Sequence, residues 1–179
     1  MNRRIACAAL VMALSVAVPT AAESTCTFPG AATVCRSPDG SWLLRWQEAT
    51  ASKPHVLFAE QRETGRTIKL LTFARSVDAI WSPDVIHVAI TDHSGSSESS
   101  VFIAELATGR VIDVEREMRR TLKTLPPIDI NGHRYFTALR WQSATMLVFE
   151  VRAYDAEPGR ELRAMFTFDL KKRTVIAAS

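Results

Sequence analysis

The 179-residue sequence predicts an all-β protein made of three similar four-stranded antiparallel units and one inserted helix. Two repeated turn motifs and the strand pattern between them predict this fold. Ser37-Pro38-Asp39 recurs 45 residues later as Ser82-Pro83-Asp84, and Thr64-Gly65-Arg66 recurs 44 residues later as Thr108-Gly109-Arg110. Short runs rich in β-branched residues separate these turns, as expected for strands. A period of this length is typical of stacked repeats.

Residues 1–22 have the layout of a secretory signal peptide. Arg3 and Arg4 precede an apolar stretch from Ile5 to Val18, and small residues follow Pro19. We expect cleavage after Ala22, which leaves a single domain at 23–179 without an integral membrane segment and places the protein in the periplasm or outside the cell. A retained N-terminal helix is the alternative.

Two cysteines remain after cleavage, Cys26 and Cys35. An even pair in an exported chain favours a disulfide, which would stabilise the fold by roughly 2–3 kcal/mol. Free or metal-binding thiols are the alternative, but no other residue has the spacing of a metal ligand.

The three units follow one another along the chain. The first, residues 31–75, has expected strands at 33–36, 42–47, 55–61 and 67–73. The second, residues 76–114, has expected strands at 77–81, 85–91, 101–106 and 111–114. The third, residues 133–179, has expected strands at 135–141, 146–153, 161–169 and 174–177. Trp81 and Trp141 take the same position in the second and third units, and we expect large aromatics that recur in this way to fill the core.

The insertion at 115–132 separates the second unit from the third. Met118, Leu122 and Leu125 share one face of an expected helix from Val114 to Leu125, because they are spaced i, i+4, i+7. Pro126-Pro127 ends this helix, and a β-hairpin with an Asn131-Gly132 turn is expected at 128–136.

These motifs resemble the TolB-type, WD40-like propeller repeat, also called the PD40 repeat. The best matches are Trp81-Ser82-Pro83-Asp84 and Ser37-Pro38-Asp39-Gly40 with Trp42. The third unit lacks the Pro-Asp pair, and the second lacks the glycine after Asp84. The resemblance implies propeller blades that form a scaffold for protein binding, with no particular chemistry. Because propellers usually close with four to eight blades, three blades predict a partial or small β-propeller, or one closed by a homo-oligomer.

Composition excludes several function classes. The 22 basic residues fall to 20 without Arg3 and Arg4, against 19 acidic ones, so the mature chain is nearly neutral and has no footprint for nucleic acid. The four histidines lack metal-ligand spacing. Asp92-His93-Ser94 contains the residue types of a hydrolase triad, but adjacent residues do not converge as a triad must. We therefore expect no metal, no cofactor and no enzymatic activity.

Two stretches break the repeat and are the candidates for binding: Glu115 to Tyr135 and the polar loop His93 to Ser100. Loops that depart from a scaffold often carry function. The candidate binding residues are Arg116, Arg119, Arg120 and Lys123 in the insertion, and His93 and Glu98 in the loop. Arginine is enriched at interface hot spots, so the insertion is expected to contact an acidic protein surface, such as the active-site cleft of a carboxylate-dependent envelope hydrolase. Alternatively, the helix only plugs the open end of the stack with its apolar face.

The sequence thus favours a non-enzymatic exported protein-binding module with a protein partner in the cell envelope. An inhibitor or immunity protein against an envelope-directed enzyme belongs to this class. A TolB-like accessory protein of envelope assembly is one alternative, and a hydrolase with an unrecognised site is another.

Overall fold

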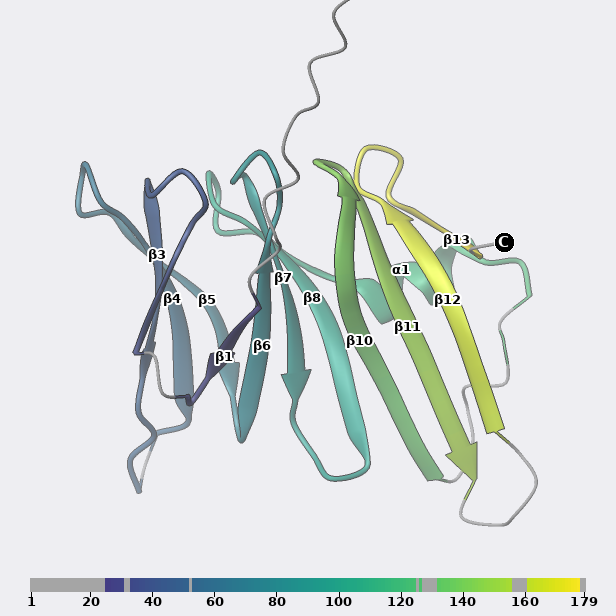
Figure 1. The fold of residues 1–179 in the computed structure, drawn as a ribbon. Coiled ribbons are helices and arrows are strands. Elements are labelled where there is room, and N and C mark those ends of the chain that lie inside the picture. The colour runs from purple at the N-terminus through teal and green to yellow at the C-terminus, as the bar shows by residue number, and fades with distance from the viewer. Residues whose placement is uncertain are drawn as a thin grey trace, which may run out of the picture.

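The computed structural model describes residues 25–30, 33–51, 53–124, 126, 132–155 and 161–177. The expected signal peptide, the expected strand at Ile128–Ile130 and Leu125 lie outside these ranges. The described chain is mostly β-strand with one helix (Figure 1). Its elements are β1 (Cys26–Phe28), β2 (Val34–Arg36), β3 (Trp42–Gln47), β4 (His55–Gln61), β5 (Thr67–Phe73), β6 (Ser76–Trp81), β7 (His87–His93), β8 (Glu98–Glu105), β9 (Val111–Asp113), α1 (Val114–Thr121), β10 (Gly132–Ser143), β11 (Met146–Asp155), β12 (Glu161–Asp169) and β13 (Thr174–Ala177).

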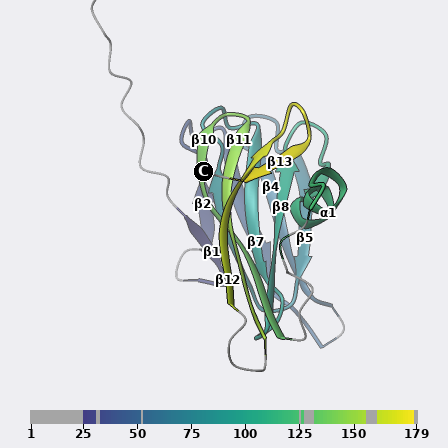
Figure 2. The ribbon, with the colours of Figure 1, turned by 90° about the vertical axis from the view of Figure 1, so that its right-hand side faces the viewer.

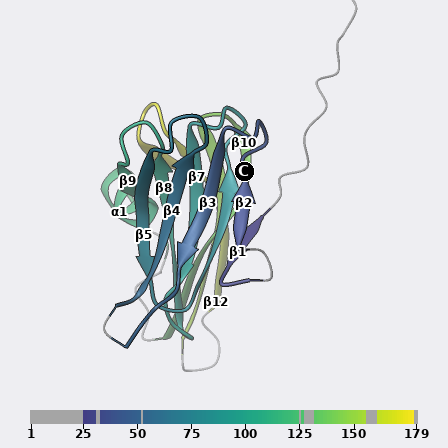
Figure 3. The same ribbon diagram turned by 90° about the vertical axis from the view of Figure 1, so that its left-hand side faces the viewer.

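The strands form three groups, each of four strands paired antiparallel in sequence order. The first group, β2 to β5, is a separate four-stranded sheet, which faces the viewer in Figure 3. The second group, β6 to β9, and the third group, β10 to β13, belong to one nine-stranded sheet with β1 at its edge. They are joined by a short parallel pairing of β8 with β10, at Arg134 opposite Glu98 and Tyr135 opposite Ser99. The three groups stand side by side in Figure 1.

The Ser-Pro-Asp turns of the first two units have the same hydrogen bonds. Ser37 Oγ donates to Asp39 Oδ1 at 2.6 Å, and Ser82 Oγ donates to Asp84 Oδ1 at 2.6 Å. Each serine Oγ also accepts a backbone N–H five residues on, at 2.9 Å in both turns. The two turns are therefore structural copies, as the sequence repeat predicts.

The outer turns repeat in all three groups. Gly65, Gly109 and Arg173 lie in the turn just before the last strand of their groups, and their φ angles are 69°, 74° and 53°. Glycine adopts positive φ freely, whereas an arginine pays a steric cost there. The third group thus has the same positive-φ turn residue without the glycine.

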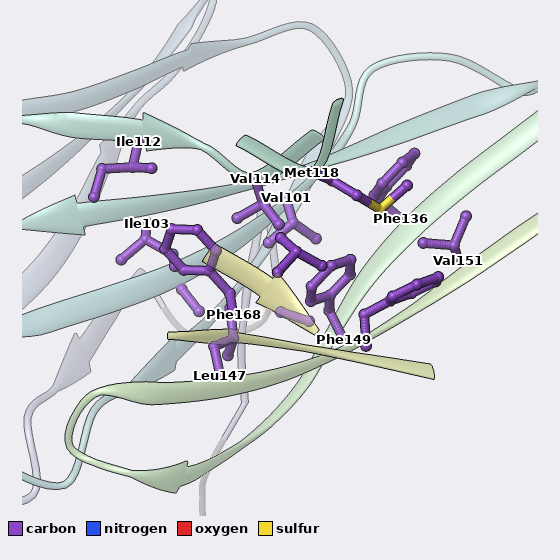
Figure 4. Packing of buried hydrophobic residues seen from close by; sticks show 14 of the residues in the cluster. Val101, Ile103, Ile112, Val114, Met118, Phe136, Leu147, Phe149, Val151 and Phe168 are labelled. Atoms are coloured by element: carbon purple, nitrogen blue, oxygen red, sulfur yellow. The ribbon is translucent and has the colours of Figure 1, made fainter. Parts of the chain in front are cut away.

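Two hydrophobic clusters hold the groups together. One lies between the first and second groups and includes Leu44, Leu57, Ile90 and Trp81. The other lies between the second and third groups; Figure 4 shows Met118 of α1 beside Phe136, with Phe149 and Phe168 nearby.

The two repeated tryptophans occupy equivalent buried positions. Trp81 and Trp141 are 4% and 5% exposed. Trp81 Nε1 donates to Cys35 Sγ at 3.4 Å and Trp141 Nε1 donates to the Ile80 carbonyl at 3.1 Å, so each reaches the first strand of the preceding group. The expectation that they fill the core is confirmed.

Cys26 and Cys35 form the predicted disulfide. Cys26 lies on β1, which pairs with β6 of the second group, while Cys35 lies on β2 of the first group. The bond therefore links the two sheets, which no backbone pairing joins within the described strands.

Several predicted bounds are wrong. The third strand of the second unit begins at Glu98 rather than Val101, so Glu98 to Ser100 belong to β8 and not to the predicted polar loop. The first strand of the third unit begins at Gly132 rather than Tyr135. The helix ends at Thr121 rather than Leu125, because Leu122 leaves the helical conformation with ψ 126°. The second strand of the second unit begins at His87 rather than Val85, because Val85 and Ile86 complete the Ser-Pro-Asp turn. Within the described ranges, no helix is long and apolar enough to cross a membrane.

Candidate functional site

The inserted helix α1 is the element on which the sequence places most candidate binding residues. Asp113 caps it, since its Oδ1 accepts the Arg116 backbone N–H at 3.0 Å. Acidic residues in the first turn and arginines in the last turn complement the helix dipole. Val114 and Met118 are buried between the second and third groups. Figure 2 shows α1 at the side of the stack, near β8 and β13.

Glu117 is the centre of an ionic cluster between α1 and the β12–β13 turn. It is 7% exposed. Arg120 donates to Glu117 Oε2 from Nε at 2.9 Å and from a terminal nitrogen at 2.7 Å, and Arg173 donates to Glu117 Oε1. Burial raises the pKa of Glu117, but the hydrogen bonds and charges of Arg120 and Arg173 outweigh it, so the net pKa shift is downward. Glu117 is therefore ionised at neutral pH and holds both guanidinium groups in place.

The same helix covers the edge of β13. Arg120 donates to the Arg173 carbonyl at 2.7 Å, and the Val175 N–H donates to Thr121 Oγ1 at 3.1 Å. An uncovered edge strand is a site of unwanted strand pairing. The alternative prediction, a helix that plugs the stack with Met118 and Leu122, is consistent with this packing, while Leu125 lies outside the described ranges.

Arg120 of the helix and Arg173 of the turn meet at Glu117, and each of these two segments carries further cations. We call the six cations of the two segments the basic patch: Arg116, Arg120, Lys123, Lys171, Lys172 and Arg173. Three of the predicted residues belong to it. The cations of Lys171 to Arg173 were not among the predicted binding residues, because a run of three basic residues is too short to indicate a binding segment by itself.

Arg119, the fourth predicted cation of the insertion, lies on another flank of the helix. It donates from Nε to Glu115 Oε1 at 2.9 Å, and Arg134 of β10 reaches the same oxygen at 3.2 Å. This second network ties α1 to β10. The four predicted cations therefore do not form a single row.

His93 and Glu98 lie at the end of the β7–β8 hairpin, which is opposite to the β12–β13 turn in Figure 1. The structure does not bring them together with the basic patch. His93 Nε2 contacts Asp78 Oδ2 at 2.8 Å, and Thr27 Oγ1 donates to the other oxygen of Asp78 at 2.6 Å. In a hydrolase triad the histidine stands between the hydroxyl and the carboxylate, whereas here the carboxylate stands between the other two.

Asp92 is the one carboxylate with a buried, unpartnered oxygen in the described part of the chain. It is 8% exposed, and its Oδ1 has no hydrogen-bond partner. Burial raises the pKa of Asp92; Glu98 adds to this shift, and His93 opposes it. Within the described ranges, no group of histidine, cysteine and acidic residues is arranged to hold a metal ion.

No protein-family model matches the chain. No curated protein matches it either. Among solved structures, it is similar to the tricorn protease with a TM-score of 0.51 and 12% identity over 82% of this chain and 12% of that chain. It is also similar to the AtxE2 isopeptidase (TM-score 0.49, 15% identity, 82% and 28% of the chains) and to TolB from Acinetobacter baumannii (TM-score 0.40, 14% identity, 81% and 31%).

The chain spans less than a third of each of these proteins. At 12% identity, the likeness to the tricorn protease concerns the fold alone, and it is consistent with a propeller-like arrangement of the strand groups.

Proposed function

We propose that this protein is a non-enzymatic, exported binding module that binds an acidic protein of the cell envelope through the basic patch. The three strand groups act as three blades of a partial propeller that positions the patch. The observation that carries the proposal is the joining of cations from α1 and from the β12–β13 turn around one buried carboxylate, Glu117.

The patch is suited to carboxylate recognition because two of its arginines are already ordered. Glu117 and the Arg173 carbonyl hold Arg120, and Glu117 also holds Arg173. Their side chains remain 58% and 41% exposed, so part of each guanidinium faces solvent. A planar guanidinium can bind a carboxylate through two hydrogen bonds, and pre-ordering reduces the entropy cost of binding.

An inhibitor or immunity protein against an envelope-directed hydrolase is the form of this function that we favour. Such an enzyme that works with carboxylates presents an acidic cleft, which complements the patch. A TolB-like accessory role in envelope assembly would use the same surface with a resident partner. The two forms differ in which partner is captured.

Capture with a charge-reversed variant tests the proposal. Arg116→Glu with Lys171→Glu reverses two patch residues that are exposed and whose side chains form no hydrogen bond or ion pair within the described chain. Lys69→Glu with Arg75→Glu makes the same charge change on or beside β5, far from α1, and is the matched control. Each protein is immobilised, and bound envelope proteins are identified by mass spectrometry.

We expect one acidic protein to bind the wild type and the control but not the patch variant. Binding that survives the patch reversal, or that is lost equally in both variants, would overturn the proposal. If the isolated protein turned over a substrate of its own, the hydrolase alternative would replace it.

A further inference from the structure

The outer face of the third strand group carries a row of opposed residues that crosses all of its strands. Its two central members, Val148 and Thr167, are buried, and exposed apolar side chains lie at its two ends. Arg140 lies opposite Val148, Val148 opposite Thr167, and Thr167 opposite Ile176. Directly opposed residues of antiparallel strands point to the same side of a sheet. The residues of alternate parity, such as Leu147, Phe168 and Val175, lie in the core between the groups, so this row faces outward. Figure 2 looks onto this side of the stack.

The row ends in exposed apolar side chains. Ile176 on β13 is 50% exposed. Leu139, the extra residue of a bulge in β10 next to Arg140, is 40% exposed. They are two of the three exposed large apolar residues in the described part of the chain. Exposed apolar groups at the two ends of one row are suited to contact a partner.

Cations surround the row. Arg140 belongs to it, and Arg152 lies opposite Arg163 two rows further along the same face. Two acids of this face are paired: Glu150 is buried and accepts from Arg163 at 2.5 Å, and Asp169 is buried 3.7 Å from Lys172 Nζ. The third, Glu161, is exposed at the start of β12, away from the row. A face that combines exposed apolar side chains with exposed cations complements an acidic protein surface rather than a basic one.

The row is also continuous with the basic patch. β13 begins directly after Arg173 and carries Ile176 on its outer face, while its edge is bound by α1 through Thr121. A partner seated on the patch is therefore beside the row.

We infer that the exposed ends of this row, Leu139 and Ile176, are the apolar half of the docking surface for the acidic partner. The inference rests on the proposed function and adds the apolar contact to it. The partner must present apolar side chains next to its carboxylates. A second copy of this chain fits less well. Among the strand residues on the outer face of its first group, Arg36, Arg45 and Lys69 are basic and only Glu60 is acidic. Docking that face on the row would bring like charges together.

The test combines crosslinking with substitution. A photo-crosslinking amino acid replaces Ile176 on the outer row or Thr72, an exposed residue of β5, as the control. The double variant Leu139→Ser with Ile176→Ser removes both exposed ends. Its affinity for the captured partner is measured by calorimetry, and its fold is checked by circular dichroism.

We expect position 176 but not position 72 to crosslink to the protein captured through the basic patch. We expect the double variant to bind it about tenfold more weakly, the loss of a hot-spot contact. If the patch reversal abolishes binding while crosslinking and the serine variant have no effect, the apolar row is not a docking surface and the proposed function stands. If neither change affects binding, both fail.

If the row instead binds a second copy of this chain or a lipid surface, the experiments give different results, and either result would overturn the inference. A crosslink between two copies of this chain, with dimers in sedimentation that the serine variant abolishes, assigns the row to self-association. Co-sedimentation of the wild type, but not the serine variant, with vesicles of phosphatidylglycerol assigns it to a lipid surface. Should the serine variant fail to fold, the crosslinking at position 176 decides alone.

Discussion

Val85 has the backbone position in the second unit that Gly40 has in the first, and both have positive φ, 57° and 72°. Each donates its N–H to the carbonyl of the serine that opens the turn, at 3.0 and 2.9 Å. A β-branched residue rarely adopts this conformation. Val85 does so with its side chain buried in the cluster between the first and second groups, so its packing offsets the strain.

Substitutions at Gly40 and Val85 are therefore expected to change the free energy of unfolding by different amounts. Gly40→Val should destabilise the fold by about 1–2 kcal/mol, because a side chain at Gly40 would meet only the end of Arg62, so the strain gains no comparable burial. Val85→Gly should change the free energy of unfolding by less than about 1 kcal/mol, because relief of strain and loss of burial nearly cancel. Urea unfolding of both variants measures this, and equal losses would contradict it.

Glu117 should contribute stability that depends on pH. Because its pKa in the folded state is lowered, the contribution is fully present above the pKa of an unfolded glutamate and is lost as the pH falls through the folded value. We expect Glu117→Gln to cost about 1–3 kcal/mol at pH 7. The difference from the wild type in urea unfolding should shrink toward acidic pH, and a difference that stays constant would show that the ionic cluster contributes nothing.

Asp92, unlike Glu117, should lower the free energy of unfolding at neutral pH. Burial raises its pKa in the folded state, so ionisation opposes folding, and the penalty grows as the pH rises above the unfolded pKa. Asp92→Asn should therefore raise the stability by about 1 kcal/mol at pH 7 and by less at low pH. Thermal unfolding at several pH values tests this, and destabilisation at neutral pH would indicate that the carboxylate has a partner.

Loss of the disulfide should loosen the first group in particular. Cys35→Ser removes the covalent link between β1 and β2 and should cost roughly 2–3 kcal/mol. Since that group otherwise adheres to the second through side chains, hydrogen exchange should rise more in β2 to β5 than in β10 to β13. A uniform rise across all three groups would argue against this view.

Most strands could be predicted because the repeat supplies the turns. The strands of the first unit match within one residue, since Ser-Pro-Asp and Thr-Gly-Arg mark their ends in the sequence. The last turn of the third unit was harder to predict, because Arg173 has a positive φ that is usual for glycine and unusual for arginine. The support it receives from Glu117 is 56 residues away in sequence and appears only in the folded chain.

The candidate site was predicted in part. Arg116, Arg120 and Lys123 lie in the basic patch, but Arg119 belongs to the network with Glu115 and Arg134, a contact that helical spacing alone shows only in part. The cations of the β12–β13 turn were missed, because pairing of β13 with β12 and its contact with α1 are tertiary features.

The most direct measurement of the central claim is the salt dependence of binding to the captured partner, for the wild type, the patch variant (Arg116→Glu with Lys171→Glu) and the control (Lys69→Glu with Arg75→Glu). We predict that the wild type and the control lose affinity alike as salt rises, because the contact is electrostatic. The patch variant should bind at least about tenfold more weakly at low salt and depend on salt much less. Equal affinities and equal salt dependence in all three proteins would contradict the claim that the basic patch binds an acidic partner.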